Sequence, residues 1–311
     1  MQYSLVIPVF NEQENIAELY TRLSKTMKSL SKDYEIVFIN DGSTDQTLNK
    51  LRDLHHQDRK VKVITFSRNF GHQTAVTAGL NYVQGKYIAV LDADLQDPPE
   101  VLPDFFTKLT QGYDVVYAIR TQRKDSWLRK TMYYLFYRLL KLMANITIPL
   151  DSGDFCVMTK RVVNLLNQLP ERNRFVRGLR SWVGFSQTGL AYARDKRYAG
   201  ISKYNMSAML KLAFDGIFSF SYVPLQILTW AGFAMFLLSI FGSLLTVYYK
   251  LFTEVYIPRG FPTTIIIIMF IGGINMLALG IIGEYIGRIY DEVKQRVQYV
   301  IESTIGIKKA D

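Results

Sequence analysis

The sequence predicts an α/β protein: a doubly wound, mostly parallel sheet with interfacial helices, followed by a two-helix transmembrane hairpin. Two observations predict this. Over the first two thirds of the chain, short apolar runs alternate with helical patterns, the order typical of strands joined by crossover helices. The last third holds two long stretches without a charged residue. At 311 residues, 49% of them hydrophobic, the chain is long enough for roughly two domains.

Five apolar runs predict the strands of the sheet. In chain order they are YSLVIPV, YEIVFIN, VKVITFS, KYIAVLDAD and YDVVYAIR. Helices are expected between them, over 14–30, 44–56 and 73–83, and from Pro98 or Pro99, where a proline's missing N–H costs nothing. In such a sheet ligands bind at the carboxyl ends of the strands. The polar residues at those ends therefore form the candidate site.

Two uncharged stretches predict helices that span a membrane. No charged residue lies between Asp215 and Lys250, and another 24 uncharged residues separate Arg259 from Glu284. Each stretch exceeds the roughly 20 apolar residues that cross a bilayer. The alternative is a pair of buried core helices, which seldom run this long without a charge. We therefore expect a transmembrane hairpin.

These boundaries predict four segments. They are a cytosolic domain, an amphipathic interfacial helix, the hairpin and a cytosolic tail, at 1–204, 205–222, 223–288 (spans at about 223–249 and 261–285) and 289–311. Lys and Arg gather on both sides of the hairpin, in 194–211 and from Arg288 onward, so both termini are expected in the cytosol. A second amphipathic stretch, 126–146, also suits the headgroup layer. Ordinary surface helices packed on the sheet are the alternative for both amphipathic segments.

Charge and cysteine content limit the binding partners and the cellular compartment that the sequence favours. The net charge of +10 favours polyanionic neighbours, but charge alone does not choose among nucleic acid, phosphate-bearing substrates and an anionic membrane. Cys156 is the only cysteine, so no intramolecular disulfide forms. The first ten residues lack the basic segment and cleavage site of a signal peptide. We expect the fold to begin at once, in the cytosol.

Acidic residues crowd the end of the fourth strand. Asp92 and Asp94 are two residues apart, so both side chains leave the strand on one side. Like charges this close make one another harder to ionise, so a cation is expected among them. Carboxylate oxygens suit Mg²⁺ or Mn²⁺, which also take phosphate oxygens. The pair predicts a metal–diphosphate complex, with a plain acidic turn as the alternative.

Six ordered motifs carry a family resemblance: VIPVFNEQENI, INDGSTDQT, SRNFGHQTAVTAGL, LDADLQDPPE, SGDFCVMTKRVV and RYAGISKY. They resemble glycosyltransferase family 2, and within it the polyprenyl-phosphate glycosyltransferases, such as bactoprenol glucosyltransferases and dolichol-phosphate mannose synthases. The resemblance covers nearly the whole chain. It implies a nucleotide-sugar-binding fold of the GT-A type, which would be the catalytic domain over 1–204.

The resemblance also implies a nucleotide pocket at the first two strand ends. Its wall and polar anchor would be Pro8, Val9, Phe10 and Glu12. Asp41 would accept the imide N–H of a uracil base, although the family often has Asp where this chain has Asn40. Without the resemblance, Asn11 and the DGSTD run would be interpreted as a helix cap and a turn.

Roles for the acidic residues follow from the same resemblance. Asp92 would hold the ribose or share the metal, Asp94 would bind the metal, and Gln96 and Asp97 would lie beneath the sugar. Asp154 aligns with the acidic residue usually described as the family's catalytic base. A lipid phosphomonoester, with a second pKa of about 6, is mostly dianionic at neutral pH. Asp154 would therefore orient groups more than remove a proton, and a structural cap or turn is the alternative.

Basic residues form the complementary part of the expected site. Cations that would clamp the donor diphosphate and the acceptor phosphate are Arg120, Arg123, Arg177, Arg180, Arg197 and Lys203. Solvated surface charge is the alternative for any one of them. His72 is interpreted as a helix cap or packing residue and is left outside the site.

The expected activity is inverting transfer of a hexose from a nucleoside diphosphate sugar to polyprenyl phosphate, with Mg²⁺ or Mn²⁺. UDP-glucose is the first choice of donor and GDP-mannose the second. The rival enzyme is a processive polysaccharide synthase, although RGLRSW lacks the Q-x-x-R-W spacing of those proteins. A non-catalytic membrane scaffold is the remaining alternative.

The expected partners are the nucleotide sugar, the lipid and the bilayer of the inner (plasma) membrane, with no nucleic acid. A homo-oligomer is also possible, because glycines at 272, 273, 280 and 283 would permit close helix packing.

Overall fold

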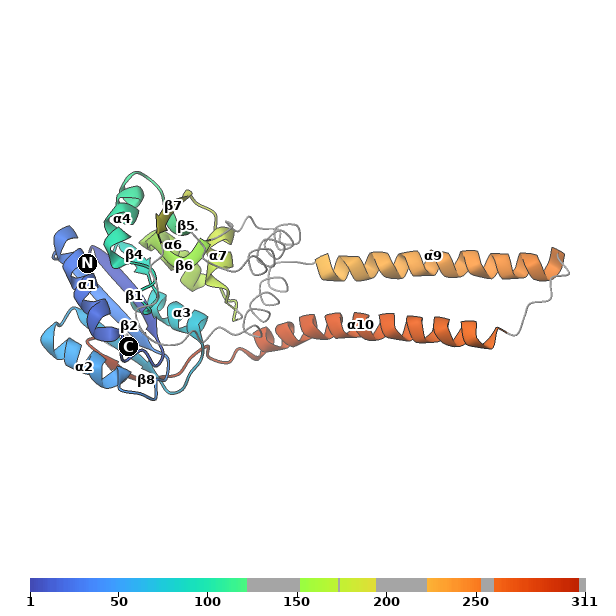
Figure 1. Ribbon diagram of the computed structural model, residues 1–311, viewed down its shortest axis with the longest axis horizontal. Coiled ribbons are helices and arrows are strands. Elements are labelled where there is room, and N and C mark those ends of the chain that lie inside the picture. Colours follow the sequence, from blue (N-terminus) through green and yellow to red (C-terminus); the bar gives the residue numbers. More distant parts are fainter. Residues whose placement is uncertain (122–151, 173, 194–222, 253–259, 308–311) are drawn as a thin grey trace.

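The computed structural model describes residues 1–121, 152–172, 174–193, 223–252 and 260–307. A domain of sheet and helices continues into two long helices that extend away from it, side by side (Figure 1). The amphipathic segments expected at 126–146 and 205–222 lie outside the described residues, as do Arg123, Arg197 and Lys203.

The elements have the following bounds. The strands are β1 (Tyr3–Val9), β2 (Tyr34–Asn40), β3 (Val61–Phe66), β4 (Tyr87–Val90), β5 (Val115–Thr121), β6 (Ser152–Thr159), β7 (Gln187–Ala193) and β8 (Ile301–Ile305). The helices are α1 (Ile16–Leu30), α2 (Thr47–Gln57), α3 (His72–Tyr82), the 3₁₀ turn η1 (Pro99–Val101), α4 (Leu102–Thr110), α6 (Lys160–Gln168), α7 (Val176–Trp182), α9 (Val223–Phe252) and α10 (Phe261–Lys294).

The described strands form one mixed sheet in the order β7-β5-β6-β4-β1-β2-β3-β8. The four strands β4, β1, β2 and β3 run parallel, whereas β6 and β8 run antiparallel to their neighbours β4 and β3. From β1 the chain extends the sheet through β2 and β3, and then returns to place β4 on the other side of β1. The expectation of a doubly wound, mostly parallel sheet is confirmed.

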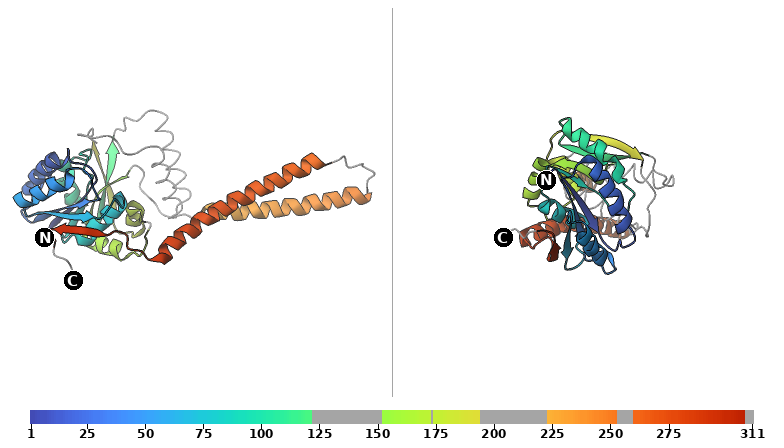
Figure 2. Two further views of the ribbon diagram at one scale, coloured as in Figure 1. Left: turned by 90° about the horizontal axis from the view of Figure 1, so that it is seen from below. Right: turned by 90° about the vertical axis from the view of Figure 1, so that its left-hand side faces the viewer.

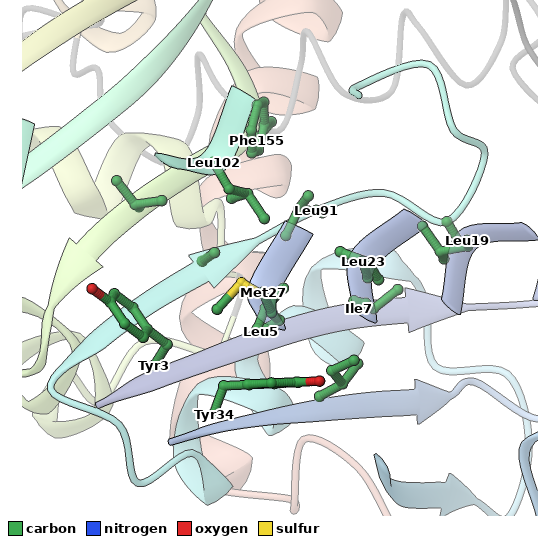
Figure 3. Close-up of a cluster of buried hydrophobic side chains, with 14 of the residues drawn as sticks. Tyr3, Leu5, Ile7, Leu19, Leu23, Met27, Tyr34, Leu91, Leu102 and Phe155 are labelled. Carbon is green, nitrogen blue, oxygen red and sulfur yellow. The ribbon is translucent and has the colours of Figure 1, made fainter. Parts of the chain in front are cut away.

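Helices cover both faces of the sheet because its central strands are buried on both sides. Every residue of β1 and β2 is buried. On one face Leu5 belongs to a core shared with Leu23 of α1 and Leu102 of α4 (Figure 3). On the other face Val6 belongs to a core shared with α3, α6 and α7. Each fully buried Leu or Val contributes about 1.5–3 kcal/mol, so these apolar strands require both helical layers.

The two long helices α9 and α10 are apolar and lie outside the core. Their most apolar windows, Val223–Gly242 and Phe270–Lys294, have mean hydropathies of 1.8 and 1.5 and are only 6% and 0% buried. The alternative of buried core helices is therefore wrong for these residues. At 1.5 Å per residue α10 is roughly 50 Å long, more than the roughly 30 Å of a bilayer core. It continues past the expected span end at 285 and reaches toward the domain.

Within the segment 289–311, expected as a cytosolic tail, the chain after α10 returns to the sheet. Ile301–Ile305 forms β8 against the edge of β3, and just before it the ring of Tyr299 stacks on Phe66 with centroids 5.1 Å apart. The run IESTI is short and partly polar, so its pattern alone did not indicate a strand. Both ends of the helix pair are attached to one domain (Figure 2).

Candidate active site

Several of the expected site residues that the structure describes, among them Glu12, Asp41, Asp92 and Asp94, lie in the loops after β1, β2 and β4, around the junction of β1 and β4. The sheet order reverses direction there, since β2 and β3 lie on one side of β1 and β4 on the other. Such a switch point is where open α/β sheets bind ligands. We divide the site into a loop half, residues 10–15, 41–46 and 68–71, and a charged half, residues 72–73, 92–97, 154 and 177–180.

In the loop half, the turn after β1 and the turn after β2 are hydrogen-bonded to each other. The backbone N–H of Asn11 donates to Oγ of Ser43 (2.9 Å), and that of Thr44 donates to Oδ1 of Asn11 (2.8 Å). The N–H of Glu12 donates to Oγ1 of Thr47 (3.0 Å). Asn11 has a φ of 52°, a left-handed conformation that asparagine tolerates better than most residues. These reciprocal bonds hold both turns in one arrangement.

Asp41 fixes a third loop to this pair. Its carboxylate accepts the backbone N–H groups of Phe70 (2.7 Å) and Gly71 (2.9 Å), and the side chain is 3% exposed. Burial raises the pKa of Asp41, opposed by these two hydrogen bonds. Gly42 follows with a φ of 68°, and a Cβ there would lie 2.4 Å from the carbonyl carbon of Arg68, so only glycine fits. A carboxylate has further lone pairs, so Asp41 can still accept a hydrogen bond from a nucleobase.

The residues expected to form the wall of the nucleotide pocket lie partly within β1 and partly beyond its end. Val9 is 2% exposed and belongs to the hydrophobic core, so its side chain does not line the pocket. Pro8 is buried in β1, two residues beyond Val6, whose carbonyl accepts the last N–H from the β4 side. Proline's missing N–H therefore falls where that ladder has ended. Phe10 and Glu12 lie half-buried past the strand, and Glu12 accepts a 2.6 Å hydrogen bond from Asn15.

Asp92 and Asp94 lie in the loop after β4, which ends at Val90. Asp94 is 7% exposed, and its Oδ1 accepts the backbone N–H of Gln96 (3.1 Å). Leu95 between them has a φ of 60°, which closes the turn. Among the described residues there is no cluster of three side chains able to ligate a metal. The site offers carboxylates in the number that Mg²⁺ accepts when a substrate phosphate supplies the other oxygens.

The expected floor beneath the sugar is more enclosed than the sequence indicated. Asp97 is 1% exposed and accepts a hydrogen bond from the hydroxyl of Tyr192 on β7. Gln96 is half-buried and contributes its backbone N–H to the turn described above. Tyr192 therefore fixes the end of the acidic loop from across the sheet.

His72 belongs to the charged half, contrary to the expectation that it is only a cap or packing residue. Its Nε2 lies 3.7 Å from Oδ1 of Asp92 and 3.5 Å from Oδ2 of Asp154. On the other side of Asp154, Nη2 of Arg177 donates to Oδ1 (3.2 Å), and Nε2 of Gln73 lies 3.4 Å from Oδ2. The first two residues of α3, the end of β4, β6 and α7 thus meet at one carboxylate.

These contacts set the charges of the cluster. Burial opposes the charged form of His72, but hydrogen bonding to Asp154 and the charges of Asp92 and Asp154 outweigh it and raise the pKa of His72 to about 9. Burial and the neighbouring carboxylates raise the pKa of Asp92 to about 6, despite His72. Burial also opposes ionisation of Asp154, yet Arg177 and His72 hold its pKa well below the usual range. Asp154 is an anion with little affinity for a proton.

Of the six expected phosphate-binding cations, the structure places two in the charged half. Arg177 forms the ion pair with Asp154, and Arg180, one turn later on α7, is 1% exposed. Arg120 lies in β5 opposite Tyr192 in register, and its side chain is outside the described residues, as are Arg123, Arg197 and Lys203. The solvated-surface alternative is therefore wrong for Arg180.

Sequence relatives agree with this geometry. The family model Glycosyl transferase family 2 matches residues 4–166. YkcC of Bacillus subtilis (strain 168), described as an uncharacterized glycosyltransferase, is 48% identical over 309 residues, which cover 99% of this chain and 95% of that one. The bactoprenol glucosyl transferase of Shigella phage SfII is 39% identical over 306 residues, which cover 98% of each chain.

A solved structure is similar at lower identity. Glucosyl-3-phosphoglycerate synthase from Mycobacterium tuberculosis, in complex with Mn²⁺, uridine-diphosphate-glucose and phosphoglyceric acid, has a TM-score of 0.48 and 17% identity, and the match covers 70% of this chain and 79% of that one. The family model spans more than half of the chain, and the relatives span nearly all of it. The mixed GT-A sheet with its acidic strand-end loop is therefore that of a glycosyltransferase, and the chain belongs to glycosyl transferase family 2.

Proposed function

We propose that this protein transfers a hexose from a nucleoside diphosphate sugar to polyprenyl phosphate and releases a polyprenyl-phosphate sugar. One observation carries the proposal: the acidic loop of Asp92 and Asp94 lies between the hydrogen-bonded turns of the loop half and the cations His72 and Arg177 that flank Asp154. Such a site has one place for a nucleotide and another for an anionic acceptor. Glucose from UDP-glucose is the preferred donor because a full-length relative is named as a bactoprenol glucosyl transferase.

In the proposed reaction, an oxygen of the lipid phosphate attacks the anomeric carbon from the face opposite the diphosphate. The bond between that carbon and the diphosphate oxygen breaks, and the configuration inverts. The phosphate attacks as a dianion, so no proton has to be removed. Most of the rate enhancement would come from holding the two anions in line, which is positional catalysis.

Asp154 suits an orienting role in this reaction. A general base must accept a proton near the working pH. Although burial raises the pKa of Asp154, its pairing with Arg177 and His72 holds that pKa far below the working pH. As a permanent anion it fixes both cations where phosphate charge has to be stabilised. His72 thereby contributes a positive charge beside Asp92.

A divalent cation fits the acidic loop. Asp94, together with Asp92, would hold Mg²⁺ or Mn²⁺. Burial and the neighbouring carboxylates raise the pKa of Asp92, and a bound cation would offset both effects. When bound, the ion would neutralise charge on the departing diphosphate. The protein's own contribution is to hold the carboxylates at the β4 end through the Gln96 and Tyr192 contacts.

The helix pair is proposed to hold the domain at the membrane, where the acceptor resides. Because β8 completes the same sheet as β1, both ends of the pair must lie on one side of a bilayer. A hairpin of two spans meets that requirement. The distribution of Lys and Arg favours the cytosolic face of the inner (plasma) membrane, with both termini inside.

The test is transfer by full-length protein in detergent with Mg²⁺, polyprenyl phosphate and a panel of labelled UDP- and GDP-sugars. We expect one labelled sugar per lipid, with UDP-glucose the best donor. A polymer would instead identify a processive synthase, and preference for GDP-mannose would reassign the donor. Absence of any transfer with every donor would contradict the proposal.

A further inference from the structure

The chain between the end of α10 and β8 is hydrogen-bonded to the connection that precedes α7. We call residues 292–300 the C-terminal strap, which begins in the last turn of α10 and runs along the domain to β8 (Figure 2). Oε1 of Glu292 accepts the backbone N–H of Arg172 (2.8 Å), and Nε2 of Gln298 donates to the carbonyl of Glu171 (2.9 Å). The strap therefore holds this connection at two successive residues.

The connection leads directly to the charged half of the site. The backbone N–H of Arg174 donates to the carbonyl of Arg172 (3.0 Å), and α7 begins soon afterwards, at Val176. The next residue is Arg177, which forms the ion pair with Asp154. A short stretch of chain therefore links the strap to the carboxylate at the centre of the charged half.

The helix α7 depends on contacts of this kind for its position. It has seven residues, and helices this short are not stable in water by themselves. Val176 and Leu179 belong to the core shared with α3 and α6, but apolar packing has no preferred direction. The polar contacts before and at the first turn therefore determine where α7 lies along that core. They are the bond from the N–H of Val176 to Oε1 of Gln73 (3.0 Å) and the hold of the strap on the connection.

The strap is itself attached firmly to the domain. Besides the stacking of Tyr299 on the sheet, its hydroxyl accepts a hydrogen bond from Nδ2 of Asn81 in the last turn of α3 (3.1 Å). The carbonyl of Val300 accepts the backbone N–H of Ser67, just after β3 (3.0 Å). The helix α3 supplies the other partners of Asp154 from its first turn. Both helices that surround this carboxylate are thus in contact with the strap.

On its other side the strap is continuous with α10. Glu292 belongs to this helix, which extends without a break from Phe261 to Lys294, past the expected end of the span at 285. A continuous helix is a rigid element that carries a displacement from one end to the other. The chain changes direction only at Gln295, which has a φ of 48° and lies beyond the contact of Glu292. The way α10 is held in a bilayer therefore sets where Glu292 lies.

We propose that Glu292 and Gln298 are positioning residues of the active site. They hold the connection before α7 so that Arg177 stays paired with Asp154, and they make turnover depend on how α10 sits in the bilayer. This inference goes beyond the proposed function, in which the helix pair keeps the domain at the membrane. It rests on that function for its kinetic measurements, whereas hydrogen exchange tests it without a substrate.

The kinetic experiment compares the double variant Glu292→Ala/Gln298→Ala with Asp291→Ala, which removes an exposed carboxylate from the same turn of α10. We expect kcat of the double variant to fall about 10- to 100-fold, as for a small displacement of a group that positions substrate, with KM for the donor unchanged. Asp291→Ala should match wild type. Glu292→Gln keeps an oxygen that accepts the N–H of Arg172, so its kcat should also match. A wild-type kcat for the double variant would overturn the proposal.

Amide hydrogen exchange of the full-length protein separates positioning from a general loss of stability. In the double variant the amides of residues 174–182 should exchange faster, while those of β1 and α2 keep their wild-type rates. Faster exchange throughout the domain, or unchanged exchange over 174–182, would contradict a positioning role. If wild type transferred no sugar but exchange over 174–182 still rose in the double variant, the positioning contacts would stand and the proposed function would fail.

Vesicles of short-chain and long-chain phosphatidylcholine test the dependence on α10. Mismatch between a span and the thickness of the hydrocarbon layer tilts the helix, so wild-type kcat should differ between the two vesicles. The double variant, in which α10 has lost its hold on the connection, should have the same low kcat in both. An effect of the lipid on the polyprenyl phosphate itself would change the rates of both proteins alike. Equal responses of the two proteins, or no response in either, would overturn the link to α10.

Discussion

The two halves of the site achieve their order by different physical means. In the loop half, backbone N–H groups meet hydroxyl, amide and carboxylate oxygens, as in the Asn11–Ser43, Thr44–Asn11 and Phe70–Asp41 contacts. In the charged half, side chains meet side chains, and Asp154 is shared between Arg177 and His72. Hydrogen bonds to the backbone hold the loop half, and attraction between charged side chains holds the charged half.

This difference indicates a division of labour between shape and electrostatics. A nucleotide is recognised through fixed donors and acceptors, so its pocket benefits from loops that hold one conformation without it. In the proposed reaction both substrates carry phosphate and repel each other, so the place where they meet would need uncompensated positive charge. His72 supplies positive charge beside Asp92 of the acidic loop. Mutations in the charged half should therefore affect turnover most, and those in the loop half should affect stability and donor affinity.

The largest effect is expected from Asp94→Asn, at the boundary of the two halves. The amide keeps the size of the side chain but loses the charge that would hold a divalent cation. We expect the rate of transfer at fixed Mg²⁺ to fall by about 10²- to 10³-fold, the usual cost of removing a preorganised electrostatic group. Asp104→Asn, an exposed residue of α4, is the control. Near-wild-type turnover of Asp94→Asn would contradict a metal site in this loop.

Asp154→Asn tests whether the charged half needs an anion or a base. If Asp154 only orients Arg177 and His72, turnover should fall about 10- to 100-fold, as for a lost charge-assisted hydrogen bond. The acid limb of the pH–rate profile should remain near pH 6, where the acceptor phosphate and Asp92 titrate. Loss of that limb in the variant would show that Asp154 is the base.

The alkaline limb of the same profile reports on His72. Its pKa of about 9 depends on the hydrogen bond to Asp154 and on the charges of Asp92 and Asp154. Asp154→Asn removes the first of these and weakens the second, so the imidazolium should lose its proton at a lower pH. The alkaline limb should then shift downward by comparison with wild type. An unshifted limb would mean that His72 does not control the rate.

The residues of the loop half could be identified from the sequence because each follows a predicted strand directly, although their hydrogen bonds join residues far apart in the chain. Asn11, Asp41 and Gly42 follow strands directly, and the strand-to-turn patterns that identify them involve neighbours in the chain. The resemblance placed Val9 in the pocket wall, and its burial in the core could not be predicted, because a strand buried on both faces has no alternation of polar and apolar residues.

The charged half was predicted only in part because its contacts join side chains whose partners depend on how the strands and helices pack. His72 is distant in sequence from both Asp92 and Asp154, and only the order of β4 and β6 in the sheet brings them together. Arg177 and Arg180 were expected as phosphate-binding cations, but a seven-residue helix has too short a pattern to predict that Arg180 is buried. The strand β8 was missed for the related reason that an edge strand needs no long apolar run.

In the loop half, Asp41→Asn should reduce stability more than catalysis. The amide oxygen can accept from Phe70 or Gly71, but its NH₂ group would face the other N–H. Leaving a buried donor unsatisfied costs about 1–3 kcal/mol, measured as a lower free energy of unfolding in urea. KM for the donor should rise while KM for the lipid stays constant. Asp53→Asn, exposed on α2, is the control, and an equal rise in both KM values would contradict the division into halves.

The smallest effect is expected at Asn11, where two replacements separate conformation from hydrogen bonding. Both Asn11→Ala and Asn11→Gly remove the oxygen that accepts the N–H of Thr44, which should cost about 1 kcal/mol. Only alanine also has to adopt the φ of 52° with a Cβ, so it should be less stable than the glycine variant by roughly another 1 kcal/mol. If donor KM follows this order while turnover at saturating donor stays level, the loop half acts through geometry alone. Equal donor KM values for the two variants, with unequal stabilities, would instead mean that the conformation of this turn does not reach the nucleotide.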